Sequence, residues 1–315
     1  LSQPGMQNGP KTSTAQPFLA SLKLPARERS PDFTTSPAAL VRIDRARLLR
    51  SAGLEQWAET ELRFAARNGD SPWALAMELS ETAASRRDFA RSIRYIIGTV
   101  PGYLFLPRDA APARFWRLAF PFPFRAAIEK YARERSIDPY LLAALIRQES
   151  VFDPAAVSPV GAIGLTQIMP TTGRSLARRL KLGYRTAYLK RPDYNLRLGT
   201  FYLGNLIASF DGRVEDALAA YNAGPSRPPK WRQWGEFRDA QEFVETIPFT
   251  QTRDYIQIIL RNADIYRWLY AGTSAPPETV GSEPAPKRIV KKPAGKSAKK
   301  PAKKSTKRSS RKKKK

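Results

Sequence analysis

Apolar residues recur at intervals of three to four from Leu40 to Gly98, and again from Phe124 to Gly272. This spacing is typical of amphipathic α-helices, whereas a half-buried β-strand would alternate apolar and polar positions. Proline and glycine punctuate the pattern between the predicted helices. Because no alternating stretch is found, the pattern predicts an all-α protein.

The first of these regions contains a weak internal repeat at an offset of 31 residues. It aligns four apolar pairs: Leu48 with Leu79, Ala52 with Ala83, Leu62 with Ile93, and Ala65 with Ile96. We predict stacked helical hairpins of the solenoid kind. Such arrays usually need three or more repeats to cover their apolar faces, so we expect further repeats before the start of this chain.

Changes in composition divide the chain into four parts. Residues 1–38 are rich in Pro, Ser and Thr, and we predict a disordered linker. Helical repeats should occupy 39–105 and a second helical domain 106–272, and the proline-rich, aromatic stretch 101–123 should be a packed joint between them. The composition of residues 273–315 cannot bury a core and predicts a disordered tail.

The chain contains no histidine and no cysteine. This excludes Ser-His-Asp and Cys-His catalysis, disulfides, and metal sites built on imidazole or thiolate. Proton transfer near neutral pH must then use carboxylates, lysine, tyrosine or the substrate itself. We expect neither a metal nor an organic cofactor.

The net charge of +26 is unevenly distributed, because residues 287–315 hold 16 of the 54 basic residues and no acid. We predict that this tail binds a polyanion, either an anionic wall polymer or a membrane surface; the alternative is a solvated appendage that binds nothing. Nucleic acid is a weaker candidate, since the helical part contains no nucleic-acid-binding motif. No signal peptide and no apolar run long enough for a membrane span are present, and Leu1 as first residue suggests a fragment or a processed chain.

One predicted helix carries a carboxylate on its apolar face. Asp138 and Pro139 give a helix-start signal, and the helix should run over residues 139–150. Glu149 falls on the buried stripe, which also holds Leu141, Leu142, Leu145 and Ile146. Burial and the helix dipole there both favour the protonated form, as a general acid requires. The alternative is a structural Glu149 that pairs with a buried arginine or caps neighbouring backbone.

Glycosidases usually need a second carboxylate, and four acids are candidates. Asp153 sits in an Asp-Pro turn and should cap local backbone. Asp211 and Asp216 flank a Gly-Arg turn and should be solvated. Glu245 is expected to bind or orient substrate rather than to act as the base.

Three motifs in this order are specific: Glu149-Ser150 followed by Gly164-Leu165-Thr166-Gln167-Ile168-Met169-Pro170, then Ala220-Tyr221-Asn222-Ala223-Gly224, then Glu245-Thr246-Ile247-Pro248 through Tyr255. Over about residues 115–272 the sequence resembles the catalytic domain of soluble lytic murein transglycosylases, in the lysozyme-like superfamily. Gln251 departs from that family, which commonly has Glu there.

The resemblance implies a carbon–oxygen lyase that cleaves the β-1,4 bond between N-acetylmuramic acid and N-acetylglucosamine in peptidoglycan glycan strands. Glu149 would be the single acid and base, and the product would carry a 1,6-anhydro ring. Substrate would be bound by Ser158, Gln167, Met169, Tyr221, Asn222 and Glu245. Tyr221 would hold either Glu149 or the acetamido carbonyl of the substrate, and Asn222 would shape its turn.

Several alternatives stay open from the sequence. Ser158 could be only a turn residue, Met169 a core filler, and Tyr221 a core aromatic. Tyr255, Trp231 and Trp234 could stack on sugars or simply pack. The protein could also be a hydrolytic muramidase using the same Glu149, or a non-catalytic peptidoglycan- or polyanion-binding protein. The resemblance further implies a periplasmic or cell-envelope location, and we expect a monomer.

Overall fold

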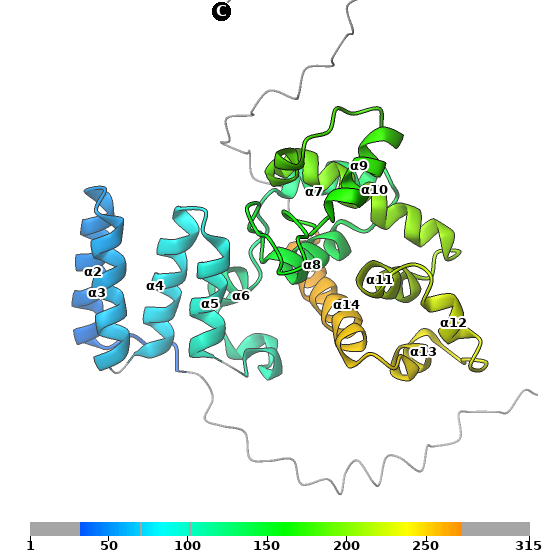
Figure 1. Cartoon of the computed structure of the whole chain (residues 1–315). Helices are drawn as coiled ribbons and strands as arrows, with labels where there is room; N and C mark the ends of the chain where they lie inside the picture. Colours follow the sequence, from blue (N-terminus) through cyan, green and yellow to red (C-terminus); the bar gives the residue numbers. More distant parts are fainter. Residues whose placement is uncertain (1–31, 70, 101, 273–315) are drawn as a thin grey trace, which may run out of the picture.

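The computed structural model describes residues 32–69, 71–100 and 102–272 (Figure 1). Within these ranges all helices are α-helices or short 3-10 helices, and the only β pairing is two isolated bridges in the segment 157–168. The predicted all-α class is therefore confirmed. None of the described helices combines the length and apolar character that crossing a membrane requires. The predicted N-terminal linker, apart from its last residues, and the predicted basic tail lie outside the described residues.

Two helical hairpins form the N-terminal part of the described chain (Figure 1). Their helices are α2 (Pro37–Ser51), α3 (Glu55–Asn68), α4 (Pro72–Ser85) and α5 (Phe89–Thr99). Both hairpins begin with a Ser-Pro pair, and the Ser36 hydroxyl accepts a hydrogen bond from the backbone of Ala39, a standard helix cap.

The offset of 31 residues predicted between the two helical repeats is too short by about one helical turn. Helices α2 and α4 begin at Pro37 and Pro72, 35 residues apart, rather than 31. The sequence offset pairs Leu48, whose side chain is 70% exposed, with the buried Leu79. A slip of four residues is close to one turn and nearly preserves the apolar face, so periodicity alone could not detect it.

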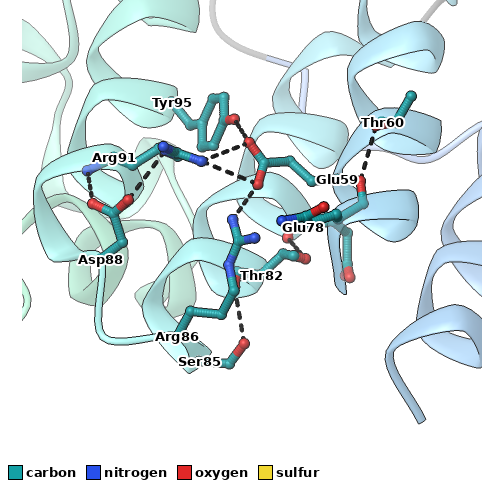
Figure 2. A network of polar contacts seen from close by, with 10 residues as sticks. Glu59, Thr60, Glu78, Thr82, Ser85, Arg86, Asp88, Arg91 and Tyr95 are labelled. Atoms are coloured by element: carbon teal, nitrogen blue, oxygen red, sulfur yellow. Dashed lines mark hydrogen bonds and ion pairs between the residues drawn. The ribbon is translucent and has the colours of Figure 1, made fainter. Parts of the chain in front are cut away.

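Buried carboxylates lie between the hairpins (Figure 2). Glu59 of α3 accepts hydrogen bonds from the Arg86 guanidinium and, at 2.5 Å, from the Tyr95 hydroxyl. Burial alone would raise the pKa of Glu59, but these two donors outweigh it and hold the pKa below its usual value. Glu78 of α4 likewise accepts from Arg114 at 2.6 Å, which joins α4 to the joint that follows. Because these charges are paired, the interface between the hairpins is polar yet satisfied.

The aromatic stretch after α5 forms a packed joint, as predicted. It contains η1 (Tyr103–Phe105), η2 (Arg108–Ala110) and α6 (Ala113–Ala119). Phe115, Trp116 and Phe120 are fully or almost fully buried, whereas Phe105 is 86% exposed. These side chains belong to one hydrophobic core that extends from α4 to α14 (Thr250–Tyr270). The expected boundary near residue 105 therefore falls inside a continuous core.

The remaining helices complete the fold (Figure 1). They are α7 (Arg125–Arg133), α8 (Pro139–Ser150), α9 (Pro170–Arg179), η3 (Thr186–Lys190), α10 (Pro192–Ser209), α11 (Val214–Ala223), α12 (Pro228–Arg232) and α13 (Ala240–Thr246). Helix α14 packs mainly against α8 and α11. Helix α8 has the bounds predicted from the sequence, and its cap, Asp138, accepts from the backbone of Tyr140. It packs along α14, whose buried stripe includes Tyr255, Ile256 and Ile259. A second, smaller core joins α9, η3 and α10.

Candidate active site

Glu149 lies in the last turn of α8, about one turn after the fully buried Leu145 and Ile146. The helix ends there because the next two residues, Val151 and Phe152, both adopt positive φ angles of 51° and 61°. This turn directs the chain away from the helix axis while the Glu149 side chain stays on the inner face.

The Glu149 side chain is half-buried, and its carboxyl is hydrogen bonded. The Tyr255 hydroxyl of α14 donates to Glu149 Oε1 at 2.5 Å. Burial raises the pKa of Glu149 from 4.5 to about 7, and the Tyr255 hydrogen bond offsets part of this increase. Among the described residues, no arginine and no second carboxylate contributes to the shift. The structural alternative of a Glu149 paired with a buried arginine is therefore wrong.

The loop that faces Glu149 is residues 163–169, called here the GLTQ loop. Asn195 of α10 is fully buried and holds it with four hydrogen bonds. Its Oδ1 accepts from the backbone N and the hydroxyl of Thr166 at 2.8 and 2.6 Å, and its Nδ2 donates to the carbonyls of Ile163 and Leu189 at 2.9 and 2.8 Å. All the hydrogen-bonding capacity of the amide is used, which makes Asn195 a rigid anchor.

Gly164 permits this close approach. Its φ is +81°, and a Cβ there would lie 2.2 Å from the Leu189 carbonyl oxygen and 2.4 Å from Asn195 Nδ2. Only glycine fits such a position. The first residue of the Gly-Leu-Thr-Gln motif is thus explained by backbone geometry.

Two further hydrogen bonds attach the loop to the helices around Glu149. The Ser150 hydroxyl donates to the Leu165 carbonyl at 2.8 Å, and the Tyr221 hydroxyl of α11 donates to the Thr166 carbonyl at 2.7 Å. Burial raises the pKa of both Tyr221 and Tyr255, and the nearby Glu149 charge raises both further. The three sequence motifs therefore meet around one carboxyl group.

The predicted binding residues on the first loop have partly local partners. Ser158 Oγ accepts from the backbone N of Ala162 at 2.9 Å, which is a turn contact. Gln167 has φ +47°, and its Nε2 donates to the Gly164 carbonyl at 2.8 Å. Met169 is 38% exposed and is therefore not a core filler.

The predicted binding residues from the later motifs lie on α11 and α13. Tyr221 donates to the loop rather than to Glu149, and Tyr255 is the residue that contacts the carboxyl. Asn222 is exposed, and its Oδ1 accepts from the Thr252 hydroxyl at 2.8 Å, which connects α11 to α14. Glu245 is also exposed and accepts from Gln257 at 2.6 Å.

The other carboxylates do not join the site. Asp153 Oδ1 accepts from the backbone of Ala155 at 2.8 Å, so it caps local backbone as predicted. The expectation of a solvated Asp216 is wrong: it is 1% exposed and forms a bidentate pair with Arg232 at 2.6 and 3.0 Å. The sequence near Asp216 resembles an exposed turn, and the partner arrives from α12. Asp211 is exposed, as expected.

The tryptophans differ in exposure. Trp231 is 5% exposed and packs edge-on against Phe249, whereas Trp234 is 59% exposed. Packing therefore explains Trp231, and only Trp234 of this pair presents a ring to solvent. Gln251 is exposed at the start of α14.

Comparison with known proteins assigns part of the chain to a known domain family. Residues 126–244 match the transglycosylase SLT domain family. The chain contains an SLT domain. The resemblance seen in the motifs is thus confirmed, and the matched range includes Glu149, the GLTQ loop and Tyr221.

Relatives of the SLT domain are much longer proteins. Over 151 residues the chain is 38% identical to the soluble lytic murein transglycosylase of Salmonella typhimurium, covering 47% of this chain and 23% of that protein. It is 37% identical over 152 residues to the Escherichia coli K12 protein of the same name, covering 47% and 24%. A putative soluble lytic murein transglycosylase of Haemophilus influenzae is 31% identical over 215 residues, covering 64% and 34%. The chain therefore spans about a quarter to a third of the length of these relatives.

Solved structures share the fold beyond the SLT domain. An inactive mutant of lytic transglycosylase Slt from Pseudomonas aeruginosa matches 76% of this chain and 38% of its own, with a TM-score of 0.59 and 30% identity. A complex of a 70-kDa soluble lytic transglycosylase with bulgecin A matches 80% and 39%, with a TM-score of 0.58 and 27% identity. Both coverages exceed the length of the SLT domain, so the similarity includes helices outside it.

Proposed function

We propose that this protein is a peptidoglycan lytic transglycosylase in which Glu149 alone serves as acid and then as base. The observation that carries the proposal is the half-buried Glu149 carboxyl, whose pKa burial raises to about 7. It is hydrogen bonded to Tyr255, and among the described residues no second carboxylate contributes to its pKa shift. A glycosidase with two catalytic carboxylates would place a partner within reach of the bond to be cleaved. The names of the relatives and of the solved structures support the same reaction class.

In the first step Glu149 donates its proton to the oxygen that links N-acetylmuramic acid to N-acetylglucosamine. The C1–O bond breaks and the N-acetylglucosamine end leaves with that proton on its 4-hydroxyl. The positive charge that develops at C1 of the muramoyl sugar is stabilised by its own acetamido oxygen, which replaces a protein nucleophile. A pKa near 7 keeps much of the carboxyl protonated at neutral pH, as an acid needs.

In the second step the ionised Glu149 takes the proton from the muramoyl 6-hydroxyl. O6 then bonds to C1, and a 1,6-anhydro ring closes. The proton returns to the carboxyl, so the site is ready for another cycle and no water is consumed. Tyr255 supports this alternation because its hydroxyl stabilises the ionised carboxylate between the two steps.

The remaining motif residues are proposed to bind the sugar chain. Gln167 uses its amide nitrogen within the loop, which leaves its carbonyl oxygen to accept from a sugar hydroxyl or acetamido N–H. Ser158 accepts from backbone, so its hydroxyl proton can be donated to substrate. The half-exposed Met169 offers an apolar contact. Asn222 and Glu245, both exposed, would contact more distant groups, and Tyr221 would orient the loop.

The basic tail is proposed to add electrostatic binding to an anionic wall polymer or membrane surface, consistent with a periplasmic or cell-envelope location. Its 16 cations should release counterions on binding, so affinity for sacculi or anionic liposomes should fall as salt rises. Comparison of the full chain with a chain ending at residue 272 tests this. Binding that is the same at low and high salt, or the same in both chains, would refute it.

The proposed reaction is tested by mass spectrometry of soluble muropeptides released from murein sacculi. The wild-type chain should release products lighter by one water than reducing muropeptides, and Glu149→Gln should release none. Glu236→Gln, which changes an exposed carboxyl elsewhere in the SLT domain, is the matched control and should retain activity. Reducing products would instead identify a hydrolytic muramidase. A folded protein without products would favour a binding protein.

A further inference from the structure

We propose that Arg147 is a positioning residue through which the aromatic joint holds the last turn of α8, and with it Glu149, in place. The inference rests on the proposed function, because it assigns the residue a role in that reaction. Arg147 lies two positions before Glu149 on α8 and takes no part in the chemistry described above.

The contacts of Arg147 all lie in the joint. Its Nη2 donates to the Tyr103 hydroxyl of η1 at 3.0 Å and to the Ala119 carbonyl of α6 at 3.1 Å. The guanidinium carbon lies 4.5 Å from the centre of the Phe120 ring, a cation–π contact. One planar group thus contacts two separate segments of the joint, η1 and the C-terminal end of α6.

These partners are all neutral, which is unusual for a buried cation. Arg147 is 9% exposed, and its Nε has no hydrogen-bond partner among the described residues. Arg261 of α14 is a second cation nearby, and burial together with the Arg147 charge lowers the pKa of Arg261. Replacing an unpaired buried ion by an apolar side chain is often neutral or stabilising, so stability alone does not account for Arg147. Its rigid fork of donors suits a role in fixing geometry.

The position of Arg147 on the helix explains how it acts on Glu149. Residues two apart on an α-helix point to nearly opposite sides, so Arg147 faces the joint while Glu149 faces Tyr255. Ser150 is fixed separately to the Leu165 carbonyl. The last turn of α8 is therefore held from three directions, immediately before the left-handed residue Val151 ends the helix.

Loss of the Arg147 contacts should let this last turn fray and admit water to the carboxyl. Burial is the largest cause of the raised pKa of Glu149, so hydration should lower that pKa. The titratable groups that face Glu149 are Tyr255 of α14 and Tyr221 of α11, and both remain neutral near pH 7 because their own pKa values are raised. The titratable groups around Arg147 are Tyr103, Arg261 and Tyr266, none of which is an acid that could replace Glu149 in the pH profile.

The experiment compares Arg147→Met, Arg147→Lys and Tyr103→Phe in the full chain. Arg133→Met, on the exposed surface of α7, is the matched control. Release of anhydro products is followed as kcat and KM across pH. The pKa of Glu149 is measured independently from its side-chain carboxyl carbon by NMR, assigned with Glu149→Gln.

The expected result for Arg147→Met is a kcat lowered about tenfold to a hundredfold with KM little changed. The Glu149 pKa and the basic limb of the kcat profile should both move down by about one pH unit. Arg147→Lys and Tyr103→Phe should give smaller changes in the same direction. If Arg147→Met does not fold, these two variants test the positioning role of Arg147. A lower melting temperature with an unmoved Glu149 pKa would overturn the proposal, as would an effect on KM alone. If the wild type releases no anhydro products, the proposed function fails, while the NMR titration still decides the role of Arg147.

Discussion

Replacing Glu149 by glutamine should stabilise the folded protein above neutral pH and leave its stability unchanged in acid. Burial raises the pKa of Glu149 from 4.5 to about 7, so the folded chain holds this proton more tightly than the unfolded chain does. Below pH 4.5 the carboxyl is neutral in both states and costs nothing. Between pH 4.5 and about 7 Glu149 ionises in the unfolded chain but not in the folded one, so the free energy of unfolding falls as pH rises. Above about pH 7 the carboxyl is ionised in both states, and the loss of stability has reached its full size.

Since one pKa unit corresponds to about 1.4 kcal/mol, this shift amounts to about 3 kcal/mol. Glutamine is neutral at every pH, and its side-chain oxygen can still accept the hydrogen bond from Tyr255. Glu149→Gln should therefore be more stable than wild type by about 3 kcal/mol at about pH 8, and equally stable at about pH 4. A catalytic residue whose removal stabilises the fold is a common trade-off between stability and function.

Urea unfolding followed by tryptophan fluorescence, with linear extrapolation at both pH values, measures this difference. Glu236→Gln is the control, because its carboxyl is exposed. A gain that is the same at both pH values would show that the carboxylate charge is not its cause. No gain at about pH 8 would show that water reaches the Glu149 carboxyl, and the reasoning from burial would then be refuted.

Three further substitutions test other parts of the site. Tyr255→Phe removes the hydrogen bond that lowers the pKa of Glu149, so the basic limb of the kcat profile should move to higher pH while kcat falls about tenfold. Asn195→Ala deletes four buried hydrogen bonds, and thermal unfolding should show a loss of about 3 kcal/mol together with lost activity. Asp216→Asn leaves Arg232 without its charged partner and should cost about 2 kcal/mol or more, with activity retained in the folded fraction.

Each of these three predictions has an outcome that would contradict it. An unmoved limb in Tyr255→Phe would mean that the hydroxyl does not contact the carboxyl in solution. Full activity of Asn195→Ala would mean that the GLTQ loop does not need its anchor. Loss of turnover by the folded Asp216→Asn protein would assign that carboxylate a catalytic part in addition to its ion pair with Arg232 of α12.

Local signals in the sequence were sufficient to predict the bounds of α8 and the position of Glu149 on its apolar face. The Asp138-Pro139 start and the apolar stripe gave the helix bounds. The place of Glu149 on that stripe predicted the raised pKa, although the side chain is half-buried rather than fully buried. Both are properties of short-range sequence, because helix capping and the 3.6-residue period depend only on neighbours a few positions away.

Partners from distant segments were decided by the tertiary structure alone. The family resemblance implied that Tyr221 holds either Glu149 or the acetamido carbonyl of the substrate, but Tyr255, 106 residues away in the chain, contacts the carboxyl. Asp216 looked solvated until α12 supplied Arg232. Asn195 gave one weak signal, a polar residue on the apolar face of its helix, which did not say what it would bind.

The pattern of residue types therefore determined an all-helical protein, and the absence of histidine and cysteine restricted proton transfer near neutral pH to carboxylates, lysine, tyrosine or the substrate. Only the packing of α8 against α14 and the joint determined which hydroxyl meets that carboxyl and which arginine holds its helix. Periodicity specifies the face on which a side chain lies, whereas its partner depends on how two faces dock. That docking is set by long-range packing, which no local pattern encodes.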